Sequence, residues 1–497
     1  MIEILLISQL FSKTYGGGNH ERAYSLLRTS DGAYALCGYT ASYGFGDNDI
    51  MLIKVNSNGS LSWARAFGGS GRDEGCSMIQ LSTGDYVISG HTRSFGDANG
   101  DAIVMCVNSS GNLSWAKTFG GSALDEAYAI ARTSDGGFAV VGATRSSGAG
   151  EEDAFLVKLN SSGDVLWAKT IGTTTYDYGY SVCEASDNGI VLAGYIYRSG
   201  GSDDILVMKT DAGGNLLWAK SIGGTSYDYA YSVIPTSDGG LAVAGYTGSW
   251  GAGGADAILI KLTSGGSLSW TRVIGGSGWD EARTVIQTSD GAFLISGYTT
   301  SWGSGGEAWL AKVDPALGVL WSRTFGGSNY EYLYDVIEAS GGLAGAGTTW
   351  SYGAGNTDFL LLTMDQQGNL PGCVVARSPS LVQVSPSSFD ASGFATWSVS
   401  SVSRSPSQAN PSPSVSDACV PTQVEEGPSS TRGIRTRLEP GLLILYSDCP
   451  VLGKVFSSDG SLVWSGIVSQ EGARIGVRPG VYFWAAGREK GKAPVCQ

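Results

Sequence analysis

The sequence predicts an all-β protein whose largest part is a seven-bladed β-propeller of four-stranded antiparallel blades. Three observations lead to this fold class. One segment returns every 51 or 52 residues, each copy contains four short strand-like segments, and no stretch shows a sustained helical period. A repeat of this length is typical of propellers and solenoids, in which a single unit cannot bury its apolar face alone.

The first strand of each repeat carries a large aromatic residue, which we expect to pack between blades. Phe11 marks the first copy, and tryptophan marks the other six: Trp63, Trp115, Trp167, Trp218, Trp270 and Trp321. The copy that begins at Asp164 shows all four strands as DVLWAKTIG, YGYSVCEAS, IVLAGYIY and DILVMKT, each rich in β-branched and aromatic residues. Turns such as TSDGG and NSSG join them and suit tight hairpins. Seven units of four strands predict seven blades.

The two ends of the repeat region predict how the ring closes. The last fourth strand, DFLLLTM, is followed by QQGNLPGC, in which Pro371 lacks the backbone donor that another strand would need. The amino terminus supplies an unmatched first strand around residues 10–15. We predict that this strand completes the last blade, so that the ring has no unpaired edge.

Composition and charge restrict the partners. The chain has 497 residues, 75 glycines, 42% hydrophobic residues and a net charge of −14, which indicates a folded, turn-rich protein with no affinity for nucleic acid. No apolar run is long enough to cross a membrane. The amino-terminal MIEILLISQL carries Glu3 and lacks the basic start of a signal peptide, so we expect a strand there and any export signal upstream of Met1.

The repeat WAKTFGGSALDEAYAIARTSDGGFAVVGATRSSGAGEEDAFLVKLNSSG resembles the bacterial and archaeal seven-bladed β-propeller repeat family, which is common in large secreted and surface proteins. The resemblance covers roughly residues 9–370. It implies the propeller fold and a secreted or cell-surface location, but neither a ligand nor a reaction.

Antiparallel order places the loops that join first to second strands and third to fourth strands on one face, which we call the acidic face. An acid begins every second strand: Glu21, Asp73, Asp125, Asp177, Asp228, Asp280 and Glu331. Another begins every fourth strand: Asp49, Asp101, Asp153, Asp204, Asp256, Glu307 and Asp358. These carboxylates either accept backbone N–H groups and fix the loops, or form a ring that holds cations.

One loop of this face carries a weak metal signal. GDANGDA places Asp97, Asn99 and Asp101 at alternating positions, as in the first half of an EF-hand loop, but without the trailing glutamate. No cofactor is predicted otherwise, and calcium at this loop is the alternative.

Aromatic residues on the acidic face are the stronger functional signal. Four precede the second-strand acid in adjacent units, and we call Tyr176, Tyr227, Trp279 and Tyr330 the rim aromatics. Five more lie between third and fourth strands, and we call Tyr43, Phe95, Trp250, Trp302 and Tyr352 the loop aromatics. Flat rings beside the carboxylates of Asp177, Asp228 and Asp280 suit sugar or protein binding, whereas rings that cover glycine-rich loops and pack between blades would be structural.

No catalytic motif occurs in the chain, and the protein is predicted not to be an enzyme. His91 replaces a tyrosine found in several repeats and is expected to be a packed strand residue. Cys37, Cys76, Cys106 and Cys183 occupy non-equivalent positions, so we expect small buried or free thiols. Five lysines of the fourth strands are expected to be solvated edge residues: Lys54, Lys158, Lys209, Lys261 and Lys312.

The amino-acid composition changes after residue 370. Residues 371–432 are rich in Ser and Pro with alternating Val and predict an extended linker or thin hairpins, bracketed by Cys373 and Cys419, which could form a disulfide. Residues 433–497 predict a small β-sandwich. Its segments LGKVFSSDGSLVWSG and ARIGVRPGVYFWAAG resemble the carboxy-terminal sorting domain of type IX secretion cargo, mostly through Gly480, Val481, Tyr482 and Phe483. The resemblance implies the secretion machinery as a partner, although KAPVCQ departs from the usual ending and Cys449 could pair with Cys496.

Together these features predict a secreted or cell-surface, non-catalytic scaffold that binds glycans or proteins through the acidic face. One alternative is a polysaccharide hydrolase or lyase that uses two carboxylates of the same face. The other is a structural spacer of a surface layer without a ligand.

Overall fold

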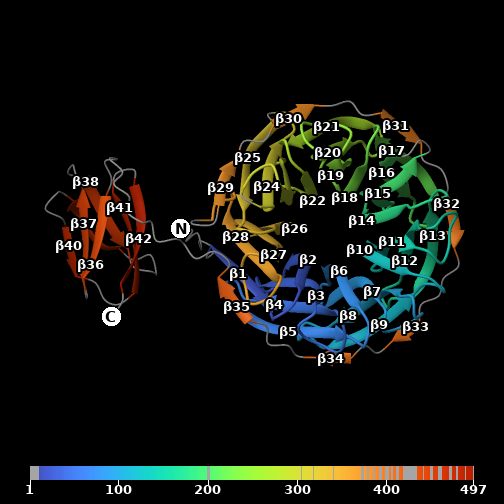
Figure 1. Cartoon of the computed structure of the whole chain (residues 1–497), viewed down its shortest axis with the longest axis horizontal. Coiled ribbons are helices and arrows are strands. Elements are labelled where there is room, and N and C mark those ends of the chain that lie inside the picture. The colour runs from blue at the N-terminus through green and yellow to red at the C-terminus, as the bar shows by residue number, and fades with distance from the viewer. Residues whose placement is uncertain are drawn as a thin grey trace. The chain divides into compact units, whose positions relative to one another are not determined.

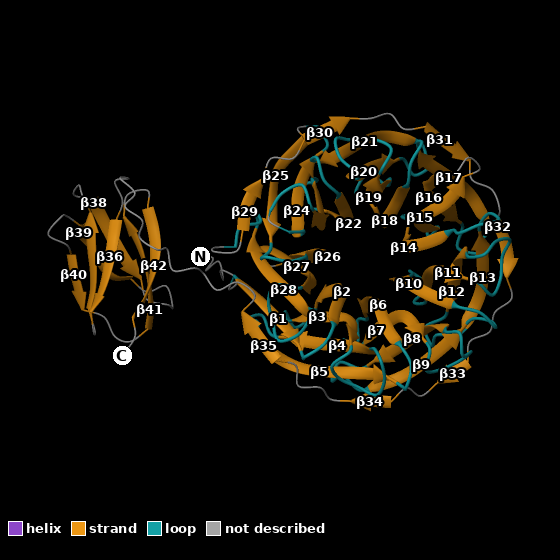
Figure 2. Ribbon diagram, in the orientation of Figure 1, coloured by secondary structure: helices purple, strands orange, loops and turns teal. Residues whose placement is uncertain are grey.

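The computed structural model describes residues 10–198, 202–303, 305–316, 318–339 and 341–370, together with the backbone of strands between residues 374 and 495. The chain divides into two compact units, Met1–Pro421 and Thr422–Gln497. All regular secondary structure in the described part of the chain is β-strand (Figure 2). Cys373, Cys419, Cys449 and Cys496, for which disulfides were predicted, lie outside the described residues.

Seven antiparallel sheets stand around a central channel and form a closed ring (Figure 1). The innermost strands are β2 (Glu21–Arg28), β6 (Asp73–Gln80), β10 (Asp125–Arg132), β14 (Tyr178–Glu184), β18 (Asp228–Pro235), β22 (Asp280–Gln287) and β26 (Glu331–Ala339). The next are β3 (Tyr34–Thr40), β7 (Tyr86–Thr92), β11 (Phe138–Thr144), β15 (Ile190–Arg198), β19 (Leu241–Thr247), β23 (Phe293–Thr299) and β27 (Gly342–Thr349). The third are β4 (Asp49–Val55), β8 (Asp101–Val107), β12 (Asp153–Leu159), β16 (Ser202–Thr210), β20 (Asp256–Leu262), β24 (Glu307–Asp314) and β28 (Asp358–Asp365). The fourth are β5 (Leu61–Gly68), β9 (Leu113–Phe119), β13 (Val165–Ile171), β17 (Leu216–Gly223), β21 (Leu268–Gly275), β25 (Gly318–Phe325) and β1 (Phe11–Gly16). The predicted all-β, seven-bladed propeller is confirmed.

The core lies between the blades. Each of the seven clusters of buried apolar side chains combines residues of two neighbouring blades. Val104 of β8 and Phe138 of β11, for example, belong to one cluster. Because both faces of a blade are covered, strands such as β11 and β12 are buried along their whole length and are mostly apolar, with Asp153 and Lys158 as the charged residues of β12.

The recurrent tryptophan packs over the hairpin turn of the following blade. A Cβ on Gly163 would lie 2.6 Å from the indole of Trp115, and Gly163 also has φ +81°. The turn therefore needs glycine for its backbone conformation and for the ring above it. The same relation joins Trp167 to Gly214 and Trp321 to Gly368.

The predicted ring closure is confirmed. Strand β1 pairs antiparallel with β28, and the backbone N–H of Phe11 donates to Thr363 Oγ1 over 2.8 Å. The amino-terminal strand thus joins the blade whose other strands come last in the chain.

The segment predicted to be a linker forms strands that were not predicted from the sequence. Seven of its short segments each add a fifth, outer strand to one blade (Figure 1). We call them the belt strands: β29 (Val374–Arg377), β30 (Ser380–Gln383), β31 (Ser387–Asp390), β32 (Phe394–Trp397), β33 (Val402–Arg404), β34 (Ser407–Ala409) and β35 (Ser414–Asp417). They visit the blades in reverse order, from β25 back to β5, and β35 finally pairs with β1. Each blade needs only three or four residues of the belt, and prolines separate several strands because they lack the N–H that pairing requires.

The second unit contains a three-stranded sheet of order β36-β37-β40 and a four-stranded sheet of order β39-β38-β41-β42. The strands are β36 (Ile434–Glu439), β37 (Leu442–Ser447), β38 (Val451–Phe456), β39 (Leu462–Val468), β40 (Ala473–Gly476), β41 (Gly480–Ala486) and β42 (Glu489–Val495). Gly480 to Phe483, which carry the likeness to sorting domains, begin β41. In the described residues there is no helix long and apolar enough to span a membrane.

The prediction of solvated edge lysines was wrong. Lys158 of β12 is almost completely buried, and its ammonium lies 2.9 Å from a carboxylate oxygen of Asp135, which follows β10 in the Ser-Asp-Gly turn. The same lysine and turn aspartate pair in four other blades: Lys54–Asp31, Lys209–Asp187, Lys261–Asp238 and Lys312–Asp290. Each pair ties the third strand of a blade to the turn that connects its first two strands.

Candidate functional site

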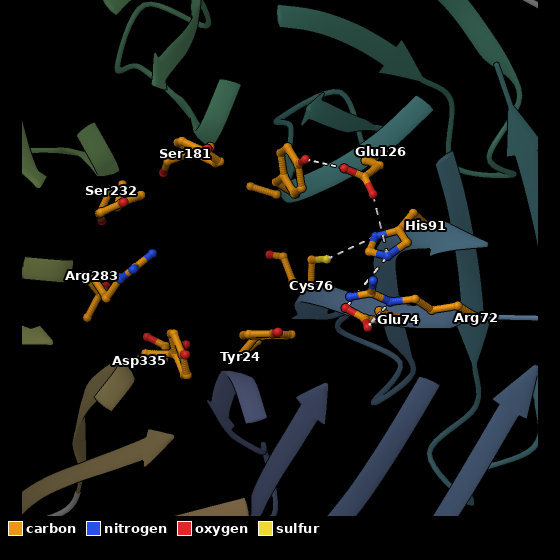
Figure 3. A pocket seen from close by; sticks show the side chains of 18 residues that line it. Tyr24, Arg72, Glu74, Cys76, His91, Glu126, Ser181, Ser232, Arg283 and Asp335 are labelled. Carbon is orange, nitrogen blue, oxygen red and sulfur yellow. Dashed lines mark hydrogen bonds and ion pairs between the residues drawn. The ribbon is translucent and has the colours of Figure 1, made fainter. Parts of the chain in front are cut away.

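The seven inner strands surround a cavity of about 450 Å³ in the centre of the ring (Figure 3). The same position in each of these seven strands supplies the most prominent side chains of the cavity. Five blades place a tyrosine there: Tyr24, Tyr128, Tyr180, Tyr231 and Tyr334. The other two blades place Cys76 and Arg283, which lie on opposite sides of the channel in Figure 3.

A β-bulge at this position explains why these side chains face the channel. In every inner strand the pairing register shifts there, so that Tyr128, for example, has no partner while Ala127 and Ala129 are paired. A bulge bends the strand and changes the direction of its side chains. The channel therefore also receives the residue that follows, which is Ser181 in β14 and Ser232 in β18.

These following residues connect neighbouring blades along the wall. Ser181 Oγ accepts the backbone N–H of Val233 over 3.0 Å, and Ser232 Oγ accepts that of Val285 over 3.2 Å. Where the last blade meets the first, Asp335 Oδ2 accepts the N–H of Leu26 over 2.8 Å. Burial raises the pKa of Asp335 to about 7. The wall is thus held by direct bonds from blade to blade.

A series of packed aromatic rings connects the mouth of the channel to its wall. The rim aromatics are all exposed, with relative exposures of 44% for Tyr176, 54% for Tyr227, 41% for Trp279 and 52% for Tyr330. Trp279 lies 5.1 Å from Tyr246, whose ring is 5.9 Å from the channel-lining Tyr231 (ring centroids).

Further tyrosines extend this series of packed rings around the propeller. Tyr195 stacks on Tyr229 at 4.2 Å, and Tyr298 stacks on Tyr332 at 4.2 Å. The exposed Tyr330 lies 6.4 Å from Tyr298. Tyr195, Tyr246 and Tyr298 are themselves buried, with relative exposures of 7%, 6% and 6%. A ligand at the mouth could therefore contact the exposed rim aromatics and the tyrosines that line the channel, and the buried rings between them hold both sets in place.

The charged groups of the wall are already paired within their blades. The guanidinium of Arg283 lies 4.0 Å above the ring of Tyr231 and 2.8 Å from Glu281. On the other side, Arg72 Nε donates to Glu74 over 2.5 Å. Because each of these cations has a carboxylate partner, the channel offers polar groups with little excess positive charge.

His91 was expected to be a packed strand residue, and it is only 6% exposed, but it belongs to a polar cluster that sequence analysis missed (Figure 3). Its Nδ1 lies 4.0 Å from Cys76 Sγ, and its Nε2 lies 3.8 Å from a carboxylate oxygen of both Glu74 and Glu126. Burial and the charges of these two glutamates raise the pKa of Cys76 well above its usual range. The available sequence signal was that one repeat replaces two aromatic positions at once, with Cys76 and His91.

The acids named as ligand-binding residues have structural partners. Asp177, Asp228 and Asp280 are fully buried, and each accepts the backbone N–H of the residue four positions earlier, over 2.5, 2.9 and 2.7 Å respectively. Asp228 also accepts the hydroxyl of Ser249 over 2.7 Å. These contacts fix the loops of the acidic face, as the structural alternative for the acids requires.

The loop aromatics are packed more closely than the rim aromatics. Trp250, Trp302 and Tyr352 are half-buried and lie against the apolar clusters between blades. The hydroxyl of Tyr352 donates to the carbonyl of Gly326 over 3.0 Å. These three rings therefore support the blade junctions and offer less surface to a ligand.

The loop predicted as an alternative calcium site forms bonds within itself. Asp101 accepts the backbone N–H of Asp97 over 2.9 Å, and the Asn99 amide donates to Asp97 over 3.1 Å and to the carbonyl of Ser122 over 2.9 Å. Among the residues with described side chains, there is no group of three or more His, Cys, Asp and Glu that could hold a metal ion. Calcium at Asp97, Asn99 and Asp101 stays a prediction.

Comparisons with known proteins are limited to parts of other chains or to distant likeness. No family model matches the sequence. The chain is 31% identical over 140 residues to the regulatory protein FlaEY of Caulobacter vibrioides, a match that covers 24% of this chain and 15% of the relative. It is 23% identical over 190 residues to the uncharacterized WD repeat-containing protein L264 of Acanthamoeba polyphaga mimivirus, covering 28% and 14%. The chain therefore spans less than a sixth of the length of these curated relatives.

Among solved structures, the chain is similar to a putative 6-phosphogluconolactonase from Bacteroides uniformis, with 11% identity, 76% of this chain and 100% of that chain covered, and a TM-score of 0.41. It is also similar to the polysaccharide lyase Uly1, with 10% identity, coverage of 73% and 98%, and a TM-score of 0.42. A third structure is PorZ, a surface component of the type IX secretion system of Porphyromonas gingivalis, with 9% identity, coverage of 98% and 99%, and a TM-score of 0.16. Similarity this distant assigns neither an activity nor a ligand, so function must be inferred from the channel itself.

Proposed function

We propose that the chain is a secreted or cell-surface, non-catalytic propeller that binds an uncharged carbohydrate at the mouth of its central channel. The observation that carries this proposal is the set of exposed rim aromatics at the mouth, which the buried Tyr246 joins by ring packing to Tyr231 on the channel wall. The cavity of about 450 Å³ lies in the range of small-molecule sites.

The chemistry of the wall favours a sugar over other small ligands. Flat rings suit the apolar faces of pyranoses, while tyrosine hydroxyls and serine hydroxyls can bond their hydroxyl groups. Exposed rings at Tyr227 and Trp279 would contact a first sugar unit, and Tyr231 would contact a unit deeper in the channel.

Charge argues for an uncharged ligand. The cations nearest the cavity, Arg72 and Arg283, are paired with Glu74 and Glu281. The chain as a whole carries a net charge of −14, so an acidic sugar would be repelled on approach. A neutral hexose oligomer needs no unpaired cation in the channel and is not repelled by the net negative charge.

Binding can be tested with purified chain by a glycan array followed by calorimetry on the best neutral oligosaccharide. The ring of Trp279 is 41% exposed and also lies against the buried Tyr246. Replacing Trp279 with alanine should lower the affinity about tenfold or more, by the magnitude typical of aromatic anchors, and thermal melting checks that the variant keeps its fold. Phe45→Ala is the matched control, because Phe45 is 49% exposed on the same face but belongs to neither the rim aromatics nor the channel wall.

Three results would count against the proposal: no binding to any neutral glycan, equal losses for Trp279→Ala and Phe45→Ala, or stronger binding to acidic glycans. Product formation from a bound oligosaccharide would instead support the hydrolase or lyase alternative, and Glu74→Gln and Glu126→Gln would then identify the carboxylates involved. The proposed location depends on the likeness to secreted repeat proteins and is checked by detecting the chain outside the cells that produce it.

A further inference from the structure

The geometry points to a binding site for one soft monovalent metal ion, of the Cu(I) class, between Cys76 Sγ and His91 Nδ1 on the channel wall. This site is separate from the proposed sugar contacts, since it lies in β6 and β7, whereas the rim aromatics precede β14, β18, β22 and β26.

The two potential ligand atoms have a suitable separation. Sγ and Nδ1 are 4.0 Å apart. Metal–thiolate and metal–imidazole bonds of about 2.3 and about 2.0 Å, the lengths found for zinc, together reach about 4.3 Å, slightly more than this separation. An ion bound by both atoms would therefore lie near the line between them, and moving the two atoms apart by about 0.3 Å would give the linear arrangement that two-coordinate Cu(I) and Ag(I) adopt.

The imidazole is oriented to present a lone pair to the sulfur. Nε2 lies 3.8 Å from both Glu74 and Glu126, so these carboxylates favour the proton on Nε2 and leave Nδ1 free to coordinate. Glu74 is fixed by Arg72 and by the Asn48 amide over 2.6 Å, and Glu126 is fixed by the Tyr128 hydroxyl over 2.5 Å. Such carboxylates behind a ligating histidine are typical of metal sites.

Charge favours a metal over a nucleophilic thiolate. A free thiolate at Cys76 would face the negative charges of Glu74 and Glu126, while the nearby cation Arg72 is already paired with Glu74. A bound cation reverses this balance, because it neutralises the thiolate and is attracted by both carboxylates. On binding, the Sγ–H bond breaks, the proton passes to water, the ion bonds to Sγ and Nδ1, and no electron is transferred.

The ligand set selects the class of ion. The residues with described side chains contain no group of three or more His, Cys, Asp and Glu that could hold a metal, so the multiple protein ligands that zinc or calcium require are not present among them. Thiolate and imidazole ligands suit Cu(I). Cys76 lines the cavity, whereas Cys37, Cys106 and Cys183 are buried elsewhere, so the channel gives this thiol alone among the four a route for the ion.

The test uses the full chain with Cys373, Cys419, Cys449 and Cys496 replaced by serine, so that thiols outside the described residues do not compete. Ag(I), which is stable in air, and Cu(I) under anaerobic conditions are titrated against a chromophoric chelator. We expect one equivalent of tightly bound ion, its loss in Cys76→Ser, and at least tenfold weaker binding in His91→Phe. Cys183→Ser is the matched control and should bind as the parent does.

Glu126→Gln supplies a second readout, because it should weaken binding a few-fold while leaving both ligand atoms in place. X-ray absorption of the loaded protein should show one sulfur and one nitrogen neighbour. Absence of binding in the parent, unchanged binding in Cys76→Ser or His91→Phe, or a spectrum with sulfur neighbours only would overturn the proposal. Thermal melting of each variant verifies that a loss of binding is not a loss of the fold.

Discussion

Replacing Gly275 with alanine should destabilise the propeller because this glycine lies between two buried carboxylates. A Cβ on Gly275, the last residue of β21, would stand 1.9 Å from Asp256 Oδ1 and 2.8 Å from Asp280 Oδ2. Asp256 is 2% exposed and Asp280 is not exposed. Neither carboxylate can simply turn away. Asp256 accepts the N–H groups of Ala252 and Gly253 over 3.0 and 3.1 Å, and Asp280 accepts the N–H of Gly276 over 2.7 Å and the hydroxyl of Ser301 over 2.6 Å.

The size of the effect follows from what must move. Overpacking a buried site costs about 1–3 kcal/mol. Losing one hydrogen bond to a buried carboxylate adds about 1.5–3 kcal/mol. We therefore expect the free energy of unfolding to fall by about 2.5–6 kcal/mol. With an unfolding entropy of about 2.1 cal/mol/K per residue, a ring of this size should show a Tm lower by about 3–8 °C.

Urea and thermal unfolding of a double-mutant cycle measure this contact. Gly18→Ala is the matched control, because no atom lies within 4 Å of the position of its Cβ. Asp256→Ser removes the nearer carboxylate, and in that background Gly275→Ala should cost about 1–3 kcal/mol less than in the parent. The steric explanation is refuted if Gly275→Ala is as stable as Gly18→Ala, or if its cost is the same in both backgrounds.

Two further predictions concern pH and ring closure. Burial raises the pKa of Asp177 and of Asp358 to about 6. Between about pH 4 and pH 6 the folded state therefore binds more protons than the unfolded state. The free energy of unfolding should fall as pH rises through this window, by at most about 2–3 kcal/mol per group. Hydrogen bonds from the paired lysine lower the pKa of Asp31 and of Asp290 to about 2, and hydrogen bonds from a turn threonine, with a smaller effect of the lysine, lower the pKa of Asp135 and of Asp238 to about 2. These four exposed aspartates make a smaller contribution, about 0.5 kcal/mol each, which is lost as pH falls from about 4 to 2. Urea unfolding should therefore show greatest stability near pH 4, and a continuous rise to pH 7 would contradict these assignments. Deleting residues 1–16 removes β1 and exposes the edge of β28, so we expect the variant to associate, as measured by light scattering. A peptide of residues 9–17 should reverse this association. A monomeric variant with an unchanged Tm would show that closure of the ring does not need this strand.

The sequence was sufficient to predict those parts of the fold that are encoded locally and repeated. Turn residues, apolar strands and the 51 or 52 residue period each occur in every unit, so errors in one copy are corrected by the others. Closure was also predictable, because a chain with one surplus strand at its start and one missing at its end has a single simple solution. The belt was not recognised, because strands of three or four residues carry too little pattern, although serine-flanked Pro379 and Pro386, and then Pro406 and Pro413, recur seven residues apart.

The channel wall could not be predicted for a different physical reason. Simple alternation along an inner strand assigns every second residue to one side. The bulge at Tyr128 and its equivalents breaks that alternation and turns two consecutive residues toward the channel, and only the pairing register reveals it. The cluster around His91 needs residues from β6, β7 and β10, and Glu126 comes from the neighbouring blade, so no spacing within one repeat could indicate it.

Recurrence and variation along the seven blades have opposite meanings in this molecule. Positions occupied by an acid in all seven repeats, such as Asp228 and Asp280, are buried and bonded to their own loops, so their recurrence reflects a demand of the fold. The bulged position of the inner strand has no such demand, because its side chain enters the channel, and it accepts tyrosine, Cys76 or Arg283. A ring brings seven such positions to one cavity, where each difference between blades changes the chemistry of a common site. The departures from the repeat, more than the repeat itself, therefore indicate where this propeller binds.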